Sequence, residues 1–167
     1  MLKRRILSVL LVLAMLVPFA GAAQTAQDNM RGVWVASVAN IDYPSSAGMT
    51  AQALAAEADT MLDNIAAMGL NTVFLQVRPS ADALYRSGLF PQSRYVSGTA
   101  GQAPDGSFDV LGYWVTAAHE RGLQLHAWIN PYRVTKKESG EAKHDFASLA
   151  DTNPAKLHRS WVVEHTD

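Results

Sequence analysis

The ten residues Leu123–Tyr132, with the sequence LQLHAWINPY, decide the fold class of this chain. Both alternating sets of positions in Leu123–Ile129 are mostly apolar, which is typical of a strand that is covered on both faces in a parallel sheet. Pro131 cannot donate a hydrogen bond to a neighbouring strand, so the strand is expected to end before it. An amide, a phenol and a guanidinium follow this strand, on Asn130, Tyr132 and Arg133.

Polar side chains at such a strand end are candidates for a binding site, because parallel α/β folds bind ligands at the carboxyl ends of their strands. The alternative interpretation is a simple strand terminator, in which Tyr132 packs and Arg133 is solvated. His126 lies inside the strand, with no second His or carboxylate at metal-ligand spacing. We therefore expect His126 to be a hydrogen-bonded core residue and predict no metal site.

Two further strands are predicted, over Gly32–Val38 (GVWVASV) and Asn71–Val77 (NTVFLQV), and both are apolar on both faces. A helix is predicted over Thr50–Met68, with Thr50 as N-cap and Gly69 as the left-handed stop. Its apolar stripe has helical spacing and consists of Leu54, Ala58, Met61, Ile65 and Met68.

A second helix is predicted over Asp109–Arg121, capped by Asp109 or Ser107 and stopped by Gly122. Its expected buried face consists of Leu111, Trp114, Val115 and Ala118. Between the second strand and this helix, residues 86–106 form a long loop, and a loop of this length is more often functional than decorative. Asn153-Pro154 predicts the start of a short helix that ends near Arg159, after a polar stretch that we expect to be solvated.

A weak internal repeat supports a parallel sheet. Gly69-Leu70 precedes one apolar strand, and 53 residues later Gly122-Leu123 precedes another. Repeated strand–helix–strand units imply crossovers within one parallel sheet, but two copies do not distinguish a closed barrel from an open doubly wound sheet. No GxGxxG or Walker sequence follows either strand, so the candidate chemistry lies on strand-end side chains, which favours the barrel.

The amino terminus has the features of an export signal. Lys3, Arg4 and Arg5 precede an apolar run over residues 6–20 and then the small residues Gly21-Ala22-Ala23. This predicts a signal peptide over residues 1–22, cleaved after Ala22 or one residue later, and a polar lead-in over residues 23–30. An uncleaved anchor is the alternative, although the apolar run is short for a membrane span. We expect an exported protein, periplasmic or extracellular, with no membrane contact after cleavage.

Charge and composition exclude several classes of function. Loss of three of the 14 Lys and Arg residues leaves 11 against 15 Asp and Glu, a mature net charge of −4. No basic run with interleaved aromatic residues is present, so nucleic acid is not an expected partner. The chain contains no Cys, which excludes disulfides and thiolate chemistry. No Ser lies in a strand–turn–helix nucleophile elbow, and the sequence carries no cofactor motif.

The remaining candidates are acids and rings near the strand ends. Asp42 and Asp82 are the acids just past predicted strands, and each could act as a substrate hydrogen-bond acceptor, a general acid or a loop cap; we favour the acceptor. Trp34 and Trp128 are expected to pack, although a tryptophan at the mouth of a barrel can stack on a sugar. His158 and His165, near the carboxyl terminus, are not expected to bind zinc.

Three ordered stretches resemble the glycosyl hydrolase-like 10 family of exported bacterial proteins. They are RGVWVASVANIDYPSS (residues 31–46), GLNTVFLQVRPSADALYRSGLFPQS (residues 69–93) and DVLGYWVTAAHERGLQLHAWINPYRV (residues 109–134). The resemblance implies a (β/α)₈ TIM-type barrel domain, of which residues 31–167 would be the truncated amino-terminal portion, about three βα units. It also implies that the sugar cleft is lined by Gln76, Arg78, Asp82, Asn130, Tyr132 and Arg133.

The activity implied by this resemblance is hydrolysis of O-glycosyl bonds in a cell-wall polysaccharide, such as the glycan strands of peptidoglycan. Glycosidases need two carboxyl groups across the scissile bond, and the family's acid-rich fourth strand has no counterpart here. We therefore expect the catalytic acids beyond Asp167 and little activity from this stretch alone. Two alternatives stay open, a non-catalytic carbohydrate-binding barrel and a truncated chain without activity.

Overall fold

The computed structural model describes residues 29–135 and 146–163, and Arg31–Asp167 forms one compact unit. The described part contains a parallel sheet in the order β1-β2-β3. The strands are β1 (Gly32–Val35), β2 (Thr72–Arg78) and β3 (Gln124–Ile129). The prediction of three parallel strands at these places is confirmed, with β1 ending three residues earlier than expected.

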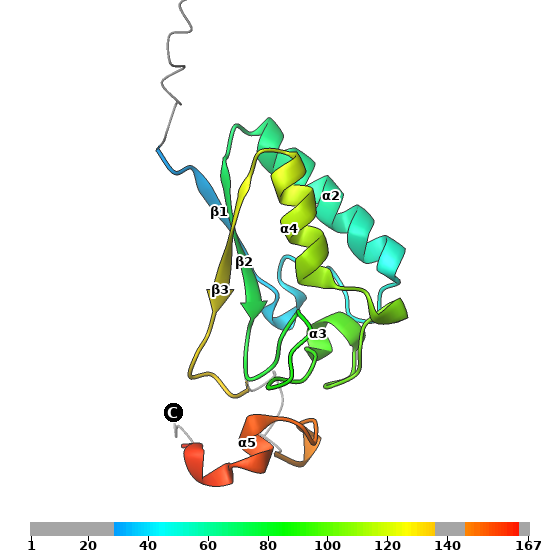
Figure 1. Ribbon diagram of the computed structural model, residues 1–167, viewed down its shortest axis with the longest axis vertical. Helices are drawn as coiled ribbons and strands as arrows, with labels where there is room; N and C mark the ends of the chain where they lie inside the picture. The colour runs from blue at the N-terminus through cyan, green and yellow to red at the C-terminus, as the bar shows by residue number, and fades with distance from the viewer. Residues whose placement is uncertain (1–28, 136–145, 164–167) are drawn as a thin grey trace, which may run out of the picture. The chain divides into compact units, whose positions relative to one another are not determined.

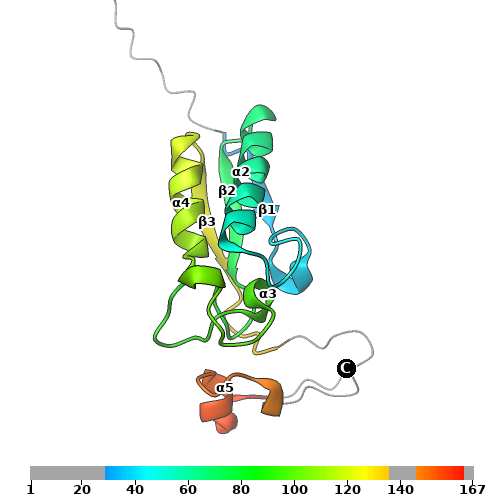
Figure 2. The ribbon, with the colours of Figure 1, turned by 90° about the vertical axis from the view of Figure 1, so that its right-hand side faces the viewer.

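Two helices connect the strands and cover one face of the sheet. Helix α2 (Ala51–Ala67) joins β1 to β2, and α4 (Val110–Glu120) joins β2 to β3. They lie side by side on the same face, as Figure 1 and Figure 2 show. The described chain is therefore a mixed α/β structure built from two consecutive strand–helix–strand units, which is compatible with part of a β/α barrel.

The helix boundaries follow from the capping residues predicted from the sequence. The Thr50 hydroxyl accepts a hydrogen bond from Ala53 N (3.2 Å), and the Asp109 carboxylate accepts one from Gly112 N (3.0 Å). Gly69 (φ 74°) and Gly122 (φ 69°) follow the two helices in the left-handed conformation, which a residue with a Cβ adopts only at a cost.

The core lies between the helices and the covered face of the sheet. Its main contributors are Leu54, Ala58, Leu62 and Ile65 from α2, Trp114, Ala117 and Ala118 from α4, and Val73, Leu75 and Val77 from β2. Two positions of the expected α2 stripe are wrong: Met61 is only partly buried and Met68 is 65% exposed. Leu62 takes the buried position instead, and Met68 lies beyond the last turn as the C-cap.

The expectation that all three strands are buried on both faces is wrong for the described residues. Only the central strand β2 is buried along most of its length, whereas β3 is largely exposed and Trp34 of β1 is 59% exposed. Within residues 29–135 and 146–163 the helices cover one face, and β1 and β3 each have one neighbouring strand. His126 is accordingly exposed and is not a core histidine.

The open face of the sheet carries a cluster of rings, Trp34, Phe74, His126 and Trp128. Trp34 stacks on Phe74 (centroids 4.6 Å apart) and meets Trp128 edge-on (5.2 Å), and Phe74 lies 5.1 Å from His126. These rings account for the second apolar set of positions in the strands. They form a continuous aromatic surface that the described residues leave uncovered.

The connections contain more structure than the sequence indicated. The loop after β2 includes the short helix α3 (Arg94–Ser97) and the 3₁₀ turn η2 (Asp105–Ser107). A turn η1 (Val38–Asn40) follows β1. The carboxyl-terminal part contains η3 (Phe146–Ser148), α5 (Pro154–Leu157) and η4 (Arg159–Trp161).

Helix α5 has Asn153 as N-cap and Pro154 in its first turn, as predicted, but ends at Leu157. The predicted signal peptide, most of the polar stretch after Arg133 and His165 lie outside the described residues. No helix in the described part of the chain is long and apolar enough to cross a membrane.

Candidate functional site

The carboxyl ends of β2 and β3 lie at one edge of the sheet (Figure 1). Hydrogen bonds join the loops that follow them. Asn130 N donates to Arg78 O (3.0 Å), just past a register shift between Gln76 and Arg78. Parallel strands in register place the residues that follow them at the same edge. Two of the predicted site residues, Arg78 and Asn130, are thereby brought together.

Asn130 is a brace between the two strand-end loops. Its Nδ2 atom donates to Pro79 O (2.9 Å), and its Oδ1 atom accepts from Trp128 Nε1 (3.0 Å). Both ends of the carboxamide are thus engaged within the protein. Asn130 positions the loop after β2 and fixes one ring of the aromatic surface.

Arg78 lies against the loop after β3. Its Nη2 atom donates to Pro131 O (3.1 Å), and its guanidinium carbon lies 4.3 Å from the centroid of the Phe90 ring. The Nε atom is buried and has no hydrogen-bond partner among the described residues. The planar guanidinium is therefore held in place on one side, while one N–H donor stays unmatched.

Gln76 is fully buried and is held by the turn after β1. Its Oε1 atom accepts from Ser37 N (3.0 Å) and Val38 N (2.9 Å), and the Ser37 hydroxyl donates to Gln76 O (2.8 Å). The Nε2 atom is also buried and has no partner in the part of the chain that the structure describes. Gln76 is paired with Trp128 across the sheet and lies two residues after Phe74 in β2, so its side chain is on the same face of the sheet as the aromatic surface.

Two unmatched, buried donors at one strand end are unusual, because an unsatisfied buried polar group costs about 1–3 kcal/mol. Sites that persist despite this cost commonly provide the donors for a ligand or an ordered water. Gln76 Nε2 and Arg78 Nε are therefore the chemically most informative atoms at this edge of the sheet.

Asp82 is half-buried in the loop after β2. Its Oδ1 atom accepts from Ser80 N (3.0 Å), and it is hydrogen-bonded to the Ser93 side chain. Burial raises the pKa of Asp82 above its ordinary value, and the hydrogen bonds from Ser93 and Ser80 and the charge of Arg94 offset part of this rise. The geometry fits a loop cap, and the raised pKa also fits a carboxyl group that carries a proton more readily than a solvated aspartate.

A small hollow of about 50 Å³ lies beside Asp82, with Ser80, Arg94 and Asn153 among the residues that line it. It is large enough for a water molecule but too small for a sugar ring. Asn153 Nδ2 donates to Ala81 O (3.0 Å), so α5 is attached to the same loop.

The other predicted site residues, Tyr132 and Arg133, are exposed to solvent. Tyr132 is 95% exposed and Arg133 is exposed, so Tyr132 does not pack against the described residues as the alternative interpretation supposed. Asp42 is exposed, and its Oδ2 atom accepts from Ala36 N (2.7 Å), which makes it a cap for the turn after β1. No group of three or more His, Asp or Glu within residues 29–135 and 146–163 could hold a metal ion.

Sequence reasoning missed Asn40, which organises the loops next to the strand ends. Its Nδ2 atom donates to Pro44 O (2.8 Å) and Tyr95 O (2.7 Å), and its backbone is left-handed (φ 52°). Asparagine tolerates this conformation better than most residues. An asparagine two residues past Val38, the predicted end of an apolar strand, was the available signal for such a turn.

Comparisons with known proteins agree on one family. The glycosyl hydrolase-like 10 family matches residues 29–166. The chain is 38% identical over 149 residues to the glycosyl hydrolase YngK of Bacillus subtilis, a match that covers 89% of this chain and 28% of YngK. It is 33% identical over 164 residues to the glycosyl hydrolase DigH of Escherichia coli, which covers 89% of this chain and 37% of DigH. The chain thus spans about a third of the length of these relatives.

Proposed function

Because the chain belongs to the glycosyl hydrolase-like 10 family, we propose that the protein in its complete form is an exported hydrolase of O-glycosyl bonds. Its proposed substrate is a cell-wall polysaccharide, such as the glycan strands of peptidoglycan. The names of YngK and DigH support the glycosidase-like class.

The proposed architecture is a (β/α)₈ barrel domain that begins at residue 31, after a signal peptide over residues 1–22 and a lead-in over residues 23–30. Two consecutive strand–helix–strand units with both helices on one face support it. In such a barrel the open face with Trp34, Phe74 and Trp128 faces the interior, where bulky side chains pack in layers. An eight-stranded barrel takes about 250 residues, so later strands would complete the sheet.

The observation that carries the proposed binding site is the pair of unmatched donors, Gln76 Nε2 and Arg78 Nε, at the carboxyl end of β2, the strand that pairs with Trp128 and Ile129 of β3. Sugars offer hydroxyl oxygens that accept hydrogen bonds and apolar ring faces that suit aromatic side chains. A glycan at the carboxyl ends of β2 and β3 would match both features. Asn130 and Asp82 would hold the walls of this site, and the exposed Tyr132 and Arg133 would lie at its entrance.

The catalytic acids would come from other strands of the complete barrel. Glycosidases use two carboxyl groups on either side of the scissile bond. Among the described residues, the acids next to strand ends are Asp42 and Asp82, and both hold turns through backbone N–H groups. Because both of these acids hold turns, a second candidate function is also supported, a carbohydrate-binding barrel without hydrolytic activity.

One assay separates these functions. The intact protein is incubated with purified peptidoglycan glycan strands, and both bound glycan and new reducing ends are measured. New reducing ends support the hydrolase, and binding without new reducing ends supports the binding barrel. If the protein neither binds nor cleaves the glycan, both candidate functions are contradicted. Asp82→Ala and Asn130→Ala should each weaken glycan binding by about 1–3 kcal/mol, whereas Thr116→Ala, on the outer face of α4, should not.

A further inference from the structure

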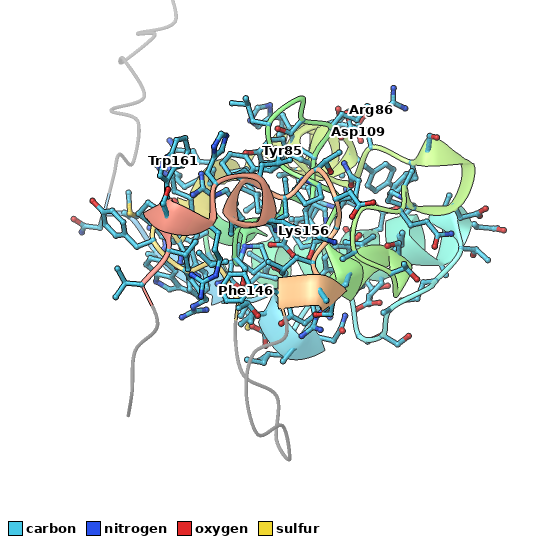
Figure 3. All side chains as sticks on the ribbon, turned by 90° about the horizontal axis from the view of Figure 1, so that it is seen from below. Tyr85, Arg86, Asp109, Phe146, Lys156 and Trp161 are labelled. Atoms are coloured by element: carbon cyan, nitrogen blue, oxygen red, sulfur yellow. The ribbon has the colours of Figure 1, made fainter. Side chains whose placement is uncertain are left out.

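A cavity of about 350 Å³ lies beside the first turn of α4, and none of the strand-end residues described above is part of its lining. Its walls come from the loop after β2 and from the segment that leads into α4. The residues that matter for its chemistry are Tyr85, Arg86, Gln92, Ser107, Phe108 and Asp109. Figure 3 shows Tyr85, Arg86 and Asp109 close together at one side of the molecule.

The walls of this cavity are held by hydrogen bonds between the two segments. Arg86 Nη2 donates to Ser107 O (2.8 Å), which joins the segments directly. Gln92 Nε2 donates to Tyr85 O (2.7 Å), so its carboxamide is fixed with the oxygen able to accept a further bond. A site held in this way needs little rearrangement when a ligand enters.

Neighbouring elements stabilise the segment that leads into α4. Asp105 accepts a hydrogen bond from Ala51 N (3.1 Å) at the start of α2, and Asp109 caps α4 through Gly112 N (3.0 Å). The Phe108 ring lies 5.4 Å from the Tyr113 ring. The cavity is therefore a feature of the folded scaffold and not a gap between loose loops.

The chemistry of the lining selects a class of ligand. Phe108 and Tyr85 are half-buried rings, whereas Arg86 and Asp109 contribute one positive and one negative charge. The balanced charge does not favour phosphate, and the charged rim does not favour a lipid chain. Rings, donors and acceptors together suit a sugar unit, and the volume lies within the usual range of about 300–1,000 Å³ for small-ligand sites.

We propose that this cavity is an accessory saccharide site that binds one sugar unit of the glycan in addition to the proposed strand-end site. The proposal rests on the proposed function, because the glycan is the substrate assigned there. Two separated attachment points would give long glycans an affinity advantage over short ones, since the second contact is made within the bound complex.

A variant that fills the cavity tests this site without removing any of its hydrogen bonds. Ala103 lines the cavity and is exposed, so Ala103→Trp places a ring in the opening. Ala56→Trp, at an exposed position on α2 outside the lining, is the matched control. The probe is the β-1,4-linked tetramer of N-acetylglucosamine, with the monomer as a short reference, and thermal unfolding verifies that both variants are folded.

We expect Ala103→Trp to weaken tetramer binding about ten-fold and to raise KM for long glycan strands, with kcat on a short aryl glycoside unchanged. Ala56→Trp should behave as the parent. In the parent, the monomer and the tetramer should shift the backbone NMR signals of Gly106 and Gly112, beside the cavity, and leave that of Gly122, which follows α4, unmoved.

The outcomes distinguish failure of the accessory site from failure of the proposed function. If the parent binds or cleaves glycan while Ala103→Trp is unchanged and Gly106 and Gly112 do not shift, the accessory site is wrong and the proposed function stands. If the parent neither binds the tetramer nor cleaves glycan strands, both are wrong. Shifts at Gly106 and Gly112 without any hydrolysis support the accessory site together with the binding barrel.

Discussion

Asn130 donates from its Nδ2 atom to Pro79 O at 2.9 Å and so ties the chain after β3 to the chain after β2. The same carboxamide accepts from Trp128 Nε1 at 3.0 Å. One side chain therefore fixes the spacing of two loops and the orientation of an indole ring at the edge of the sheet where the glycan is proposed to bind.

Asn130→Ala should lower the free energy of unfolding by about 1–2 kcal/mol, because both hydrogen bonds are lost and Trp128 Nε1 is left unmatched. Chemical denaturation of the intact protein measures this. Tyr132→Ala, at a 95% exposed position two residues away, should change the value by less than about 0.5 kcal/mol. Equal effects of the two substitutions would show that Asn130 does not brace the loops.

Asp82→Asn should alter how stability depends on pH. Burial raises the pKa of Asp82 in the folded protein, so the folded protein binds this proton more tightly than the unfolded chain. The parent therefore loses stability as the pH rises from the unfolded to the folded pKa of this group. In the Asp82→Asn variant, the amide oxygen can still accept the hydrogen bond from Ser80 N, but the side chain does not titrate.

The Tm of Asp82→Asn relative to the parent should consequently increase between about pH 3, below the ordinary aspartate pKa, and about pH 7. Thermal unfolding at a series of pH values measures this difference. A constant difference, or one that decreases over that range, would mean that burial does not control the protonation of Asp82.

Gly69→Ala should destabilise the protein by about 1 kcal/mol, because φ at Gly69 is +74° and a Cβ is disfavoured in that conformation. Nothing lies within 4 Å of the added Cβ, so the cost comes from the backbone alone. Gly88→Ala is the matched control, since that site is equally open and is not left-handed. Equilibrium unfolding in urea compares the two, and equal stability of both variants would contradict the assignment of Gly69 as the helix stop.

The mature protein should begin at Ala23 or Gln24. The basic residues 3–5, the apolar run and the small residues before Ala23 form the expected signal. Mass spectrometry of the protein recovered from the cell exterior or the periplasm determines its first residue. Recovery from the cytoplasm of a chain that starts at Met1 would contradict export.

Much of the fold could be predicted from local patterns, because capping and periodicity act over a few residues. Thr50, Asp109 and Asn153 were recognisable as N-caps, and Gly69 and Gly122 as helix stops. Burial was harder to predict, because it depends on what lies across the sheet. Trp34 and His126 have the pattern of covered positions, yet the helices cover the opposite face and both side chains are exposed.

The site shows the same division between local and distant determinants. The polar residues after β2 and β3 could be picked out as strand-end candidates, but their partners could not. Gln76 Oε1 is held by Ser37 and Val38, 39 and 38 residues earlier in the chain, and only these contacts show which of its two polar atoms is left unmatched. Tyr132 follows the same strand as Asn130, yet it points into solvent.

The most direct test of the central claim is the glycan affinity of Arg78→Lys in the intact protein. Lysine keeps the positive charge but lacks the Nε donor and the planar fork. The matched control is Arg121→Lys, after the carboxyl end of α4 and so near the amino ends of the strands. With both variants folded, isothermal titration with the N-acetylglucosamine tetramer should give about ten-fold weaker binding for Arg78→Lys, or about 1.4 kcal/mol, and no change for Arg121→Lys. Parent-like affinity of Arg78→Lys would contradict a glycan site at the end of β2.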